Sequence, residues 1–418
     1  MPHTRIALSR PIMKTLSLSS LPALLLTTLL AATLPLAAQS PSAPGRWPIG
    51  KADAWQAHHK WPVGSNYIPD NAINQLEMWQ KSTFDPAEIN RELSWAQADG
   101  MTTMRVFLHN LLWQQDPAGF QHRINVFLSI AAKHHIKPIF VLFDSCWDPF
   151  PHLGPQHPPI PGVHNSGWVQ APGAKMLQNP ADYPQLEAYV KGIVGAFAND
   201  PRILAWDVWN EPDNTNISSY GKEEPKNKIA LVDHLLPQVF QWARAEHPTQ
   251  PLTSGIWQGD WTSFSTLSPT AKIQIENSDI ITFHNYGWPE QFAAAIQDLA
   301  QYHRPILCTE YMARGVGSTI DTILPIARRD NVGAINWGFV VGKTQTNLPW
   351  DSWQRPYVLI QPPVWFHDLY YQNGKPYRAR EIQIIRALDS NTHWGPTPDP
   401  SPLPKTMLSS RPKVAHQR

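Results

Sequence analysis

Short apolar segments alternate with longer amphipathic segments over most of the chain. Eight of the short segments are rich in β-branched and aromatic residues, have the length of a strand buried on both faces, and end at Gly, Pro or polar positions. They span residues 61–68, 102–108, 137–144, 203–212, 251–256, 279–284, 305–310 and 333–338, the fourth being stopped by its closing proline. Helical patterns lie at residues 85–100, 121–135, 183–197, 226–247, 289–302, 318–330 and 380–388. Because strand and helix periods alternate, the pattern predicts a parallel α/β protein.

Eight strand segments are the number that closes a (β/α)8 barrel of the TIM type, and residues 61–390 are expected to form it as a single elaborated domain. The chemistry of such a barrel lies at the C-terminal ends of its strands. Asn210 and Glu211 occupy that position in the fourth segment, and Glu310 in the seventh. An isolated Asn-Glu-Pro sequence is usually a polar turn. Its functional interpretation depends on its position at the C-terminal end of a barrel strand. Arg105, inside the apolar second segment, needs an acidic partner if it is buried.

Two strand-end motifs, Trp-Asn-Glu-Pro at 209–212 and Cys-Thr-Glu-Tyr at 308–311, resemble those of the clan A retaining glycoside hydrolases, especially family 5, the cellulase and mannanase type. The resemblance covers residues 61–388 and implies that Glu211 is the acid/base and Glu310 the nucleophile. A retaining enzyme needs its two carboxyl groups about 5 to 5.5 Å apart. The implied function is a secreted hydrolase that cleaves β-linked glucan, mannan or xylan by double displacement.

The resemblance also implies roles for side chains around the two glutamates. Arg105 corresponds to the arginine that hydrogen-bonds the nucleophile, and Asn210 to the residue that holds the sugar 2-hydroxyl. His284 and Tyr286 correspond to the pair that flanks the nucleophile, and Trp337 to the floor beneath the attacked sugar. Without the motifs, His284 and Trp337 would each be interpreted as core residues.

The third segment departs from the family pattern, with Asp144 and Trp147 where a His-Asn element is usual. Asp144 is expected either to hold a substrate hydroxyl or to cap the loop that follows, and the departure leaves the preferred sugar open. That loop, residues 146–182, is long and rich in Pro, Gly and His, which is typical of a functional wall over a cleft. Trp147, Trp168 and Trp257 are expected to line further sugar subsites.

Composition indicates a large folded domain without a strong charge bias. The 418 residues are 42% hydrophobic, and the net charge of +1 gives no electrostatic footprint for nucleic acid. The 19 Trp residues suit surfaces that stack on sugars, although core filling accounts for many of them. Only Cys146 and Cys308 are present, so free thiols are expected. No metal or other cofactor is expected, because no zinc-ligand spacing is matched by the loop histidines His152, His157 and His164.

The two ends of the chain lack the barrel pattern. Residues 1–38 combine basic positions with an apolar stretch, which predicts a signal peptide cleaved near Ala38, with a membrane anchor as the alternative. Met13 offers a second start for translation. Residues 39–60 are interpreted as a Pro-rich leader, and residues 391–418 are expected to be disordered. The protein is therefore expected to be secreted or periplasmic and free of the membrane after cleavage.

The mode of action stays open at this level. An endo-acting enzyme on polysaccharides and an exo-acting enzyme on oligosaccharides need the same catalytic residues. A barrel that only binds carbohydrate is a further alternative, but the presence of both strand-end glutamates and of Arg105 weighs against it. The protein is expected to act as a monomer on a polysaccharide or oligosaccharide.

Overall fold

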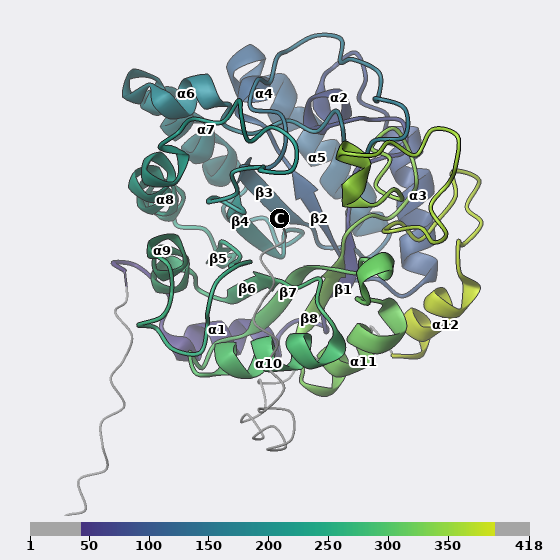
Figure 1. Ribbon diagram of the computed structural model, residues 1–418. Coiled ribbons are helices and arrows are strands. Elements are labelled where there is room, and N and C mark those ends of the chain that lie inside the picture. The colour runs from purple at the N-terminus through teal and green to yellow at the C-terminus, as the bar shows by residue number, and fades with distance from the viewer. Residues whose placement is uncertain (1–42, 389–418) are drawn as a thin grey trace, which may run out of the picture. The chain divides into compact units, whose positions relative to one another are not determined.

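The computed structural model describes residues 43–388, in which eight parallel strands form a barrel (Figure 1). The strands are β1 Val63–Asn66, β2 Thr103–Phe107, β3 Ile139–Asp144, β4 Ala205–Asn210, β5 Leu252–Thr253, β6 Ile281–His284, β7 Ile306–Tyr311 and β8 Gly333–Asn336. Their order is β5-β4-β3-β2-β1-β8-β7-β6, and a parallel bridge between Ile256 and Phe283 joins the two ends of this sheet. The predicted (β/α)8 barrel is confirmed, and each predicted segment contains one of the strands except the seventh, which ends one residue before β7 does.

Helices surround the strands on their outer side (Figure 1). The α-helices are α1 Ile49–Ala57, α2 Gln75–Trp79, α3 Pro86–Ala98, α4 Asn110–Gln115, α5 Pro117–Lys133, α6 Ala174–Gln178, α7 Tyr183–Ala196, α8 Lys228–Ala245, α9 Pro269–Asn277, α10 Pro289–Ala300, α11 Ile320–Arg329 and α12 Ala379–Ala387. Short 3-10 turns are η1 Pro180–Asp182, η2 Arg314–Val316 and η3 Trp350–Trp353. All seven predicted helices are present. Two of them continue through a proline, Pro237 in α8 and Pro325 in α11.

Two of the unpredicted helices fill places where the barrel pattern is weak. The helix α9 begins at a Ser268 N-cap, whose hydroxyl accepts from the backbone of Ala271, but its apolar residues do not form a clear stripe. The helix α1 lies inside the predicted leader. This leader packs on the barrel, because Trp47 donates its backbone N–H to Asp279 and accepts from Arg304.

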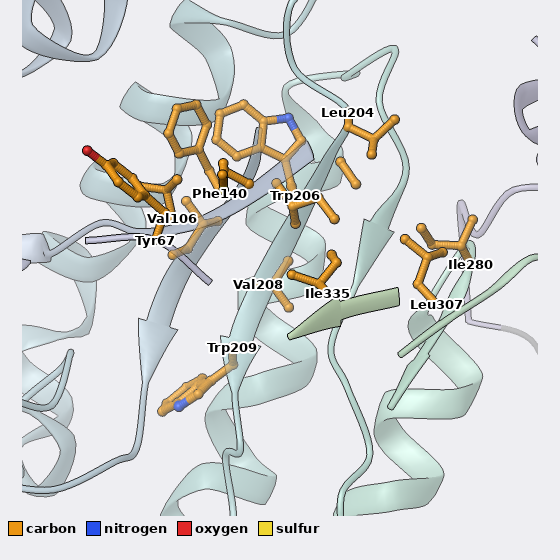
Figure 2. Packing of buried hydrophobic residues seen from close by; sticks show 14 of the residues in the cluster. Tyr67, Val106, Phe140, Leu204, Trp206, Val208, Trp209, Ile280, Leu307 and Ile335 are labelled. Carbon is orange, nitrogen blue, oxygen red and sulfur yellow. The ribbon is translucent and has the colours of Figure 1, made fainter. Parts of the chain in front are cut away.

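The apolar core lies between the strands and the outer helices (Figure 2). Phe140 on β3 has its ring centroid 5.8 Å from that of Trp206 on β4 and 6.0 Å from that of Phe127 on α5. Figure 2 also shows Val208 on β4 and Ile335 on β8 among the buried residues. Burying each large apolar side chain stabilises the fold by about 1.5 to 3 kcal/mol. Because this core stabilises the fold, the barrel tolerates polar groups in its interior and at its mouth.

The barrel interior is polar where it supports the mouth. Arg105 on β2 donates to Asp207 on β4, although β3 lies between these two strands in the sheet. Their contact therefore runs through the inside of the barrel. On the neighbouring strand β1, Oδ1 of Asn66 accepts from Nη1 of Arg105 at 2.9 Å. This polar interior leads directly to the strand ends that carry the candidate site.

The predicted signal peptide at residues 1–38 and the predicted disordered tail at residues 391–418 lie outside the described residues. Within residues 43–388, no helix has both the length and the apolar character needed to cross a membrane. Cys146 and Cys308 are both free thiols, as predicted.

Candidate active site

Glu211 and Glu310 face each other across the C-terminal mouth of the barrel. Glu211 directly follows β4, and Glu310 lies near the end of β7. One carboxylate oxygen of each lies within 4.8 Å of the other and of a ring nitrogen of His284. Glu211 has a φ of 41°, a left-handed conformation that is uncommon for a residue other than glycine and that often marks functional positions. The close approach of these two oxygens fits a retaining pair of carboxyl groups, which lie about 5 to 5.5 Å apart.

Arg105 connects the barrel interior to Glu310. Its Nη1 donates to Oε1 of Glu310 at 2.8 Å and to Oδ1 of Asn66 at 2.9 Å. Its Nε and Nη2 donate to Oδ2 of Asp207 at 3.0 and 2.8 Å, and Nη2 also donates to Oδ1 of Asn210 at 2.7 Å. Arg105 and Asp207 are both fully buried, so the cation is balanced by two acids. Arg105 therefore has two acidic partners, Asp207 and Glu310, where the sequence predicted at least one.

Three side chains hold the carboxyl group of Glu211. Nδ1 of His284 lies 2.8 Å from its Oε1, Nδ2 of Asn214 donates to its Oε2 at 2.7 Å, and Sγ of Cys146 lies 3.3 Å from Oε2. Burial raises the pKa of Glu211 above its ordinary value, and the donors on Asn214 and Cys146 partly offset this rise. A carboxyl group with a raised pKa keeps its proton closer to neutral pH, which suits a general acid.

Glu310 is held from two sides. Its Oε1 accepts from Arg105, and its Oε2 accepts from the Tyr286 hydroxyl at 2.8 Å. Burial raises the pKa of Glu310, and the neighbouring Glu211 adds to this rise, whereas His284, Arg105 and Tyr286 oppose it. Arg105 therefore limits an upward shift of this pKa and does not bring it below its ordinary value. Both oxygens are fixed in place, as a nucleophile requires.

His284 is buried between the two glutamates. Burial lowers the pKa of His284 to about 4, so its imidazole is neutral near pH 7. The hydrogen bond to Glu211 then carries either the ring proton or the carboxyl proton. Together with Glu211 and Glu310, His284 offers atoms of the type that bind metal ions. Arg105 and the hydrogen bonds already account for these atoms, and the absence of a metal requirement stays a prediction.

Asp144 positions its neighbours at the end of β3. Its Oδ1 accepts from Nδ2 of Asn210 at 2.9 Å and from the backbone N–H of Cys146 at 3.0 Å, and its Oδ2 accepts from Nε1 of Trp168 at 2.6 Å. Burial raises the pKa of Asp144 to about 6. Because both oxygens are occupied, the geometry favours a loop cap over a group that holds substrate. The amide of Asn210, bonded to Asp144 and Arg105, has a fixed orientation.

Trp337 follows β8 and belongs to an aromatic cluster with Phe107 and Trp168. Its ring centroid is 5.8 Å from that of Phe107 and 5.9 Å from that of Trp168, both in edge-on arrangements. Trp168 is only 2% exposed, whereas Trp337 is partly exposed. Trp337 therefore has an accessible surface beside the glutamates, and Trp168 supports it from behind.

The other two predicted tryptophans are Trp147, which also packs against the buried cluster of Phe107 and Trp168, and Trp257. Trp147 stacks on Trp353, with centroids 5.5 Å apart and an interplanar angle of 10°. Trp257 donates its Nε1 to Oδ1 of Asp213 at 2.6 Å and is partly exposed. In the described part of the chain, none of the loop histidines joins a cluster of metal-binding side chains; these are His152, His157 and His164. His164 is buried and hydrogen-bonds the backbone oxygen of Leu348.

Several residues of the site were not assigned from the sequence. Asp207 is the one charged residue of its strand, and pairing it with Arg105 across the barrel could have identified it. Asn214 and Cys146 gave no such signal, because both reach Glu211 from loops without periodicity. Asn66 lies on β1 and contacts Arg105 inside the barrel.

Comparisons with known proteins agree with this geometry. The model of the cellulase family, glycosyl hydrolase family 5, matches residues 160–340. Mannan endo-1,4-β-mannosidase A of Podospora anserina is 26% identical over 213 residues, which are 47% of this chain and 51% of that protein. The chain thus spans about half the length of this relative.

Solved structures show the same fold. An exo-β-1,4-mannosidase from Opitutaceae bacterium strain TAV5 is similar with a TM-score of 0.53 and 16% identity, over 80% of this chain and 62% of that one. A β-1,4-mannanase from the sea hare Aplysia kurodai has a TM-score of 0.51 and 16% identity, over 82% of this chain and 96% of that one. The match to the cellulase family model and the shared barrel fold agree with the resemblance of this chain to glycosyl hydrolase family 5.

Proposed function

We propose that this protein is a retaining β-glycoside hydrolase that acts on mannan-type glycans, with Glu211 as acid/base and Glu310 as nucleophile. The observation that carries the proposal is the pair of buried carboxyl groups whose oxygens lie within 4.8 Å of each other. Their different partners support the division of roles. Glu211 has neutral neighbours in His284 and Asn214, whereas Glu310 contacts the Arg105 cation.

The proposed reaction proceeds in two displacements. In the first, Glu310 attacks the anomeric carbon, and Glu211 gives its proton to the departing glycosidic oxygen. In the second, Glu211 takes a proton from water, and the resulting attack releases the sugar from Glu310. Tyr286 and Arg105 orient the nucleophile, and Asn210 is placed to bind the 2-hydroxyl of the attacked sugar.

The choice of mannan among the three glycans rests on the relatives. The Podospora anserina protein and the two solved structures described above all act, by their names, on β-mannose linkages. Glucan and xylan stay the alternatives, because the residues around Trp337 do not distinguish the sugars. A barrel that only binds glycan is disfavoured by the complete set of hydrogen bonds on both glutamates.

The test is a panel of substrates given to the purified protein. It contains the 4-nitrophenyl β-glycosides of mannose, glucose and xylose and the corresponding β-1,4-linked polysaccharides. We expect the mannose compounds to be cleaved fastest, and NMR of the first product to show the β-anomer. Binding to mannan without any cleavage would make the protein a carbohydrate-binding barrel, and an α-anomer as first product would exclude retention.

We also propose export of the protein, on the basis of residues 1–38 alone. Mass spectrometry of the secreted or periplasmic protein should give an N-terminus near Gln39. An intact N-terminus in the membrane fraction would contradict this proposal and support an anchor.

A further inference from the structure

The position of Trp337 defines which side of the mouth holds the attacked sugar. Glu211 after β4 and Glu310 on β7 divide the barrel mouth into two sides. The first route between them runs through β5 and β6, and the second runs through β3, β2, β1 and β8. Trp337, the proposed floor of the attacked sugar, follows β8. The attacked sugar and any sugar joined to its non-reducing side therefore lie toward the second route. The leaving group lies past Glu211, toward β5 and β6, because Glu211 must reach the departing oxygen.

Two long loops meet over the side of the attacked sugar. They are the segments between β3 and α6, residues 145–173, and between β8 and α12, residues 337–378. The backbone N–H of Asn165 donates to the oxygen of Thr344 at 2.7 Å. That of His164 donates to the Ser352 hydroxyl at 2.9 Å. We call these joined segments the loop bridge.

Aromatic and buried polar contacts reinforce the loop bridge. The Trp147 ring stacks on Trp353, which connects the two loops near Glu211. Lys228 on α8 is almost fully buried and donates to the backbone oxygen of Ser145 and to Glu224. These contacts join the two loops to each other and to α8, so we expect the bridge to be a fixed wall.

Almost no space remains between the bridge and the barrel behind Trp337. The cavity there has a volume of about 20 Å³ and is lined by residues of β1, β2, Trp168 and the loop after β8. This volume holds about one water molecule and is too small for a second sugar ring. Trp168, 2% exposed, fills the place next to Trp337.

On the leaving-group side, the loops after β4 and β5 are also long, at residues 211–227 and 254–268, and Tyr220 contacts Trp353 of the bridge, so the wall on this side is low only over β6. The loop after β6 consists of residues 285–288 only, and its Trp288 is 61% exposed. Trp257 lies on the same side, after β5, and is partly exposed. A chain of sugars can extend over this side from the departing oxygen.

We propose that the loop bridge makes the site a pocket for one terminal sugar, so that the enzyme is exo-acting and removes single residues from the non-reducing ends of β-linked glycans. This inference rests on the proposed retaining hydrolysis and adds the part of the chain on which it acts. The substrate class is then linear β-linked oligosaccharides, and the interior of a polysaccharide is excluded.

The test follows products over time from β-1,4-mannohexaose whose reducing end has been reduced to an alditol. If the panel of aryl glycosides shows another preferred sugar, the hexaose of that sugar replaces it. We expect free monosaccharide as the sole free sugar and alditols that shorten by one unit at a time. Early release of free disaccharide or trisaccharide would overturn the inference while leaving the hydrolase function intact. Failure to cleave the hexaose and every aryl glycoside would instead refute the proposed function, and this inference with it.

Two variants at one position separate the volume of Trp168 from its hydrogen bond. Trp168→Ala removes both the ring and the bond to Asp144, whereas Trp168→Phe removes the bond but keeps most of the ring. We expect Trp168→Ala to release free disaccharide in addition to monosaccharide, and Trp168→Phe to keep the wild-type product pattern. Equal product patterns in two folded variants would contradict a role for this ring in blocking the pocket. If both variants fail to fold, the wild-type time course decides.

Discussion

The two sides of the barrel mouth differ in how their loops are built. Toward β8, β1, β2 and β3, the loop bridge covers the strand ends, and Trp168 is almost fully buried beneath it. Toward β5 and β6, the loop after β6 is short, and Trp288 is largely exposed. The closed side has fixed hydrogen bonds and little empty volume, whereas the open side presents aromatic surface to solvent. This difference supports the proposal that one side selects a single sugar and the other accepts varied leaving groups.

Polar side chains inside the barrel hold the reacting groups at the closed side of the mouth. Arg105 holds Asn210 and Glu310 at the same time and is itself anchored by Asp207. On the open side, Trp257 does not hold the reacting groups in this way. It contacts Asp213 at the edge of the mouth. Changes on the closed side should therefore reduce catalysis with every substrate, and changes on the open side should matter only when the leaving group is long.

The largest expected effect is that of Arg105→Ala. We expect kcat to fall by about 10² to 10³, because the variant loses a charged group that orients and stabilises the reacting carboxylate. The free energy of unfolding should also fall by about 3 to 5 kcal/mol, because Asp207 is left buried without its cation. Steady-state kinetics and urea unfolding measure the two effects. Arg105→Lys, which keeps the charge but loses the planar fork, is the control, and unchanged turnover in folded Arg105→Ala would contradict the assignment.

Trp337→Ala should have a smaller effect, with about a fivefold loss in kcat/KM, from the loss of about 1 kcal/mol of stacking. The loss should be equal for aryl glycosides and for oligosaccharides, because Trp337 contacts the attacked sugar in both. Trp257→Ala on the open side is the matched variant, and it should affect oligosaccharides alone. Kinetics with both substrate types make the comparison. If Trp257→Ala weakened aryl glycoside hydrolysis as strongly as Trp337→Ala does, the proposed division of the mouth would be wrong.

Cys146→Ala should leave kcat/KM at its optimum nearly unchanged and alter its pH dependence. The thiol donates to Glu211 and favours the ionised carboxylate, so its removal raises the pKa of Glu211. The acid then keeps its proton to a higher pH, and the basic limb of the kcat/KM profile moves upward. Cys146→Ser, which keeps a donor, should not show this movement. A basic limb that moves downward in Cys146→Ala would contradict the proposed contact.

Much of the barrel could be predicted because each strand is a separate apolar segment with its own boundaries. The positions of Glu211 and Glu310 could be predicted for the same reason, since both lie at the C-terminal ends of such segments. The helix α9 was missed because its cap at Ser268 precedes a segment without a clear apolar stripe. Local pattern is therefore sufficient where one face of an element is uniformly apolar.

Contacts between distant loops could not be predicted in this way. Cys146 and Glu211 are 65 residues apart and meet only because β3 and β4 are neighbours. The bond from Asn165 to Thr344 joins two loops with no periodic pattern, so nothing in either segment indicates its partner. The pKa of Glu310 shows the same limit. The sequence predicted that Arg105 contacts Glu310, but it gave no sign of the burial, which depends on the whole fold and raises the pKa of Glu310.

The central claim is that Glu211 is the acid/base and Glu310 the nucleophile, and azide rescue tests it most directly. With 2,4-dinitrophenyl β-mannoside, whose phenol leaves without a proton, Glu211→Ala should still form the glycosyl-enzyme and then stall, because no base activates water. Added azide should restore turnover and give the β-glycosyl azide. Glu310→Ala should be inactive until azide enters from the opposite face and gives the α-glycosyl azide. Reversed anomers would exchange the two roles, and wild-type turnover in both variants would place the chemistry elsewhere in the barrel.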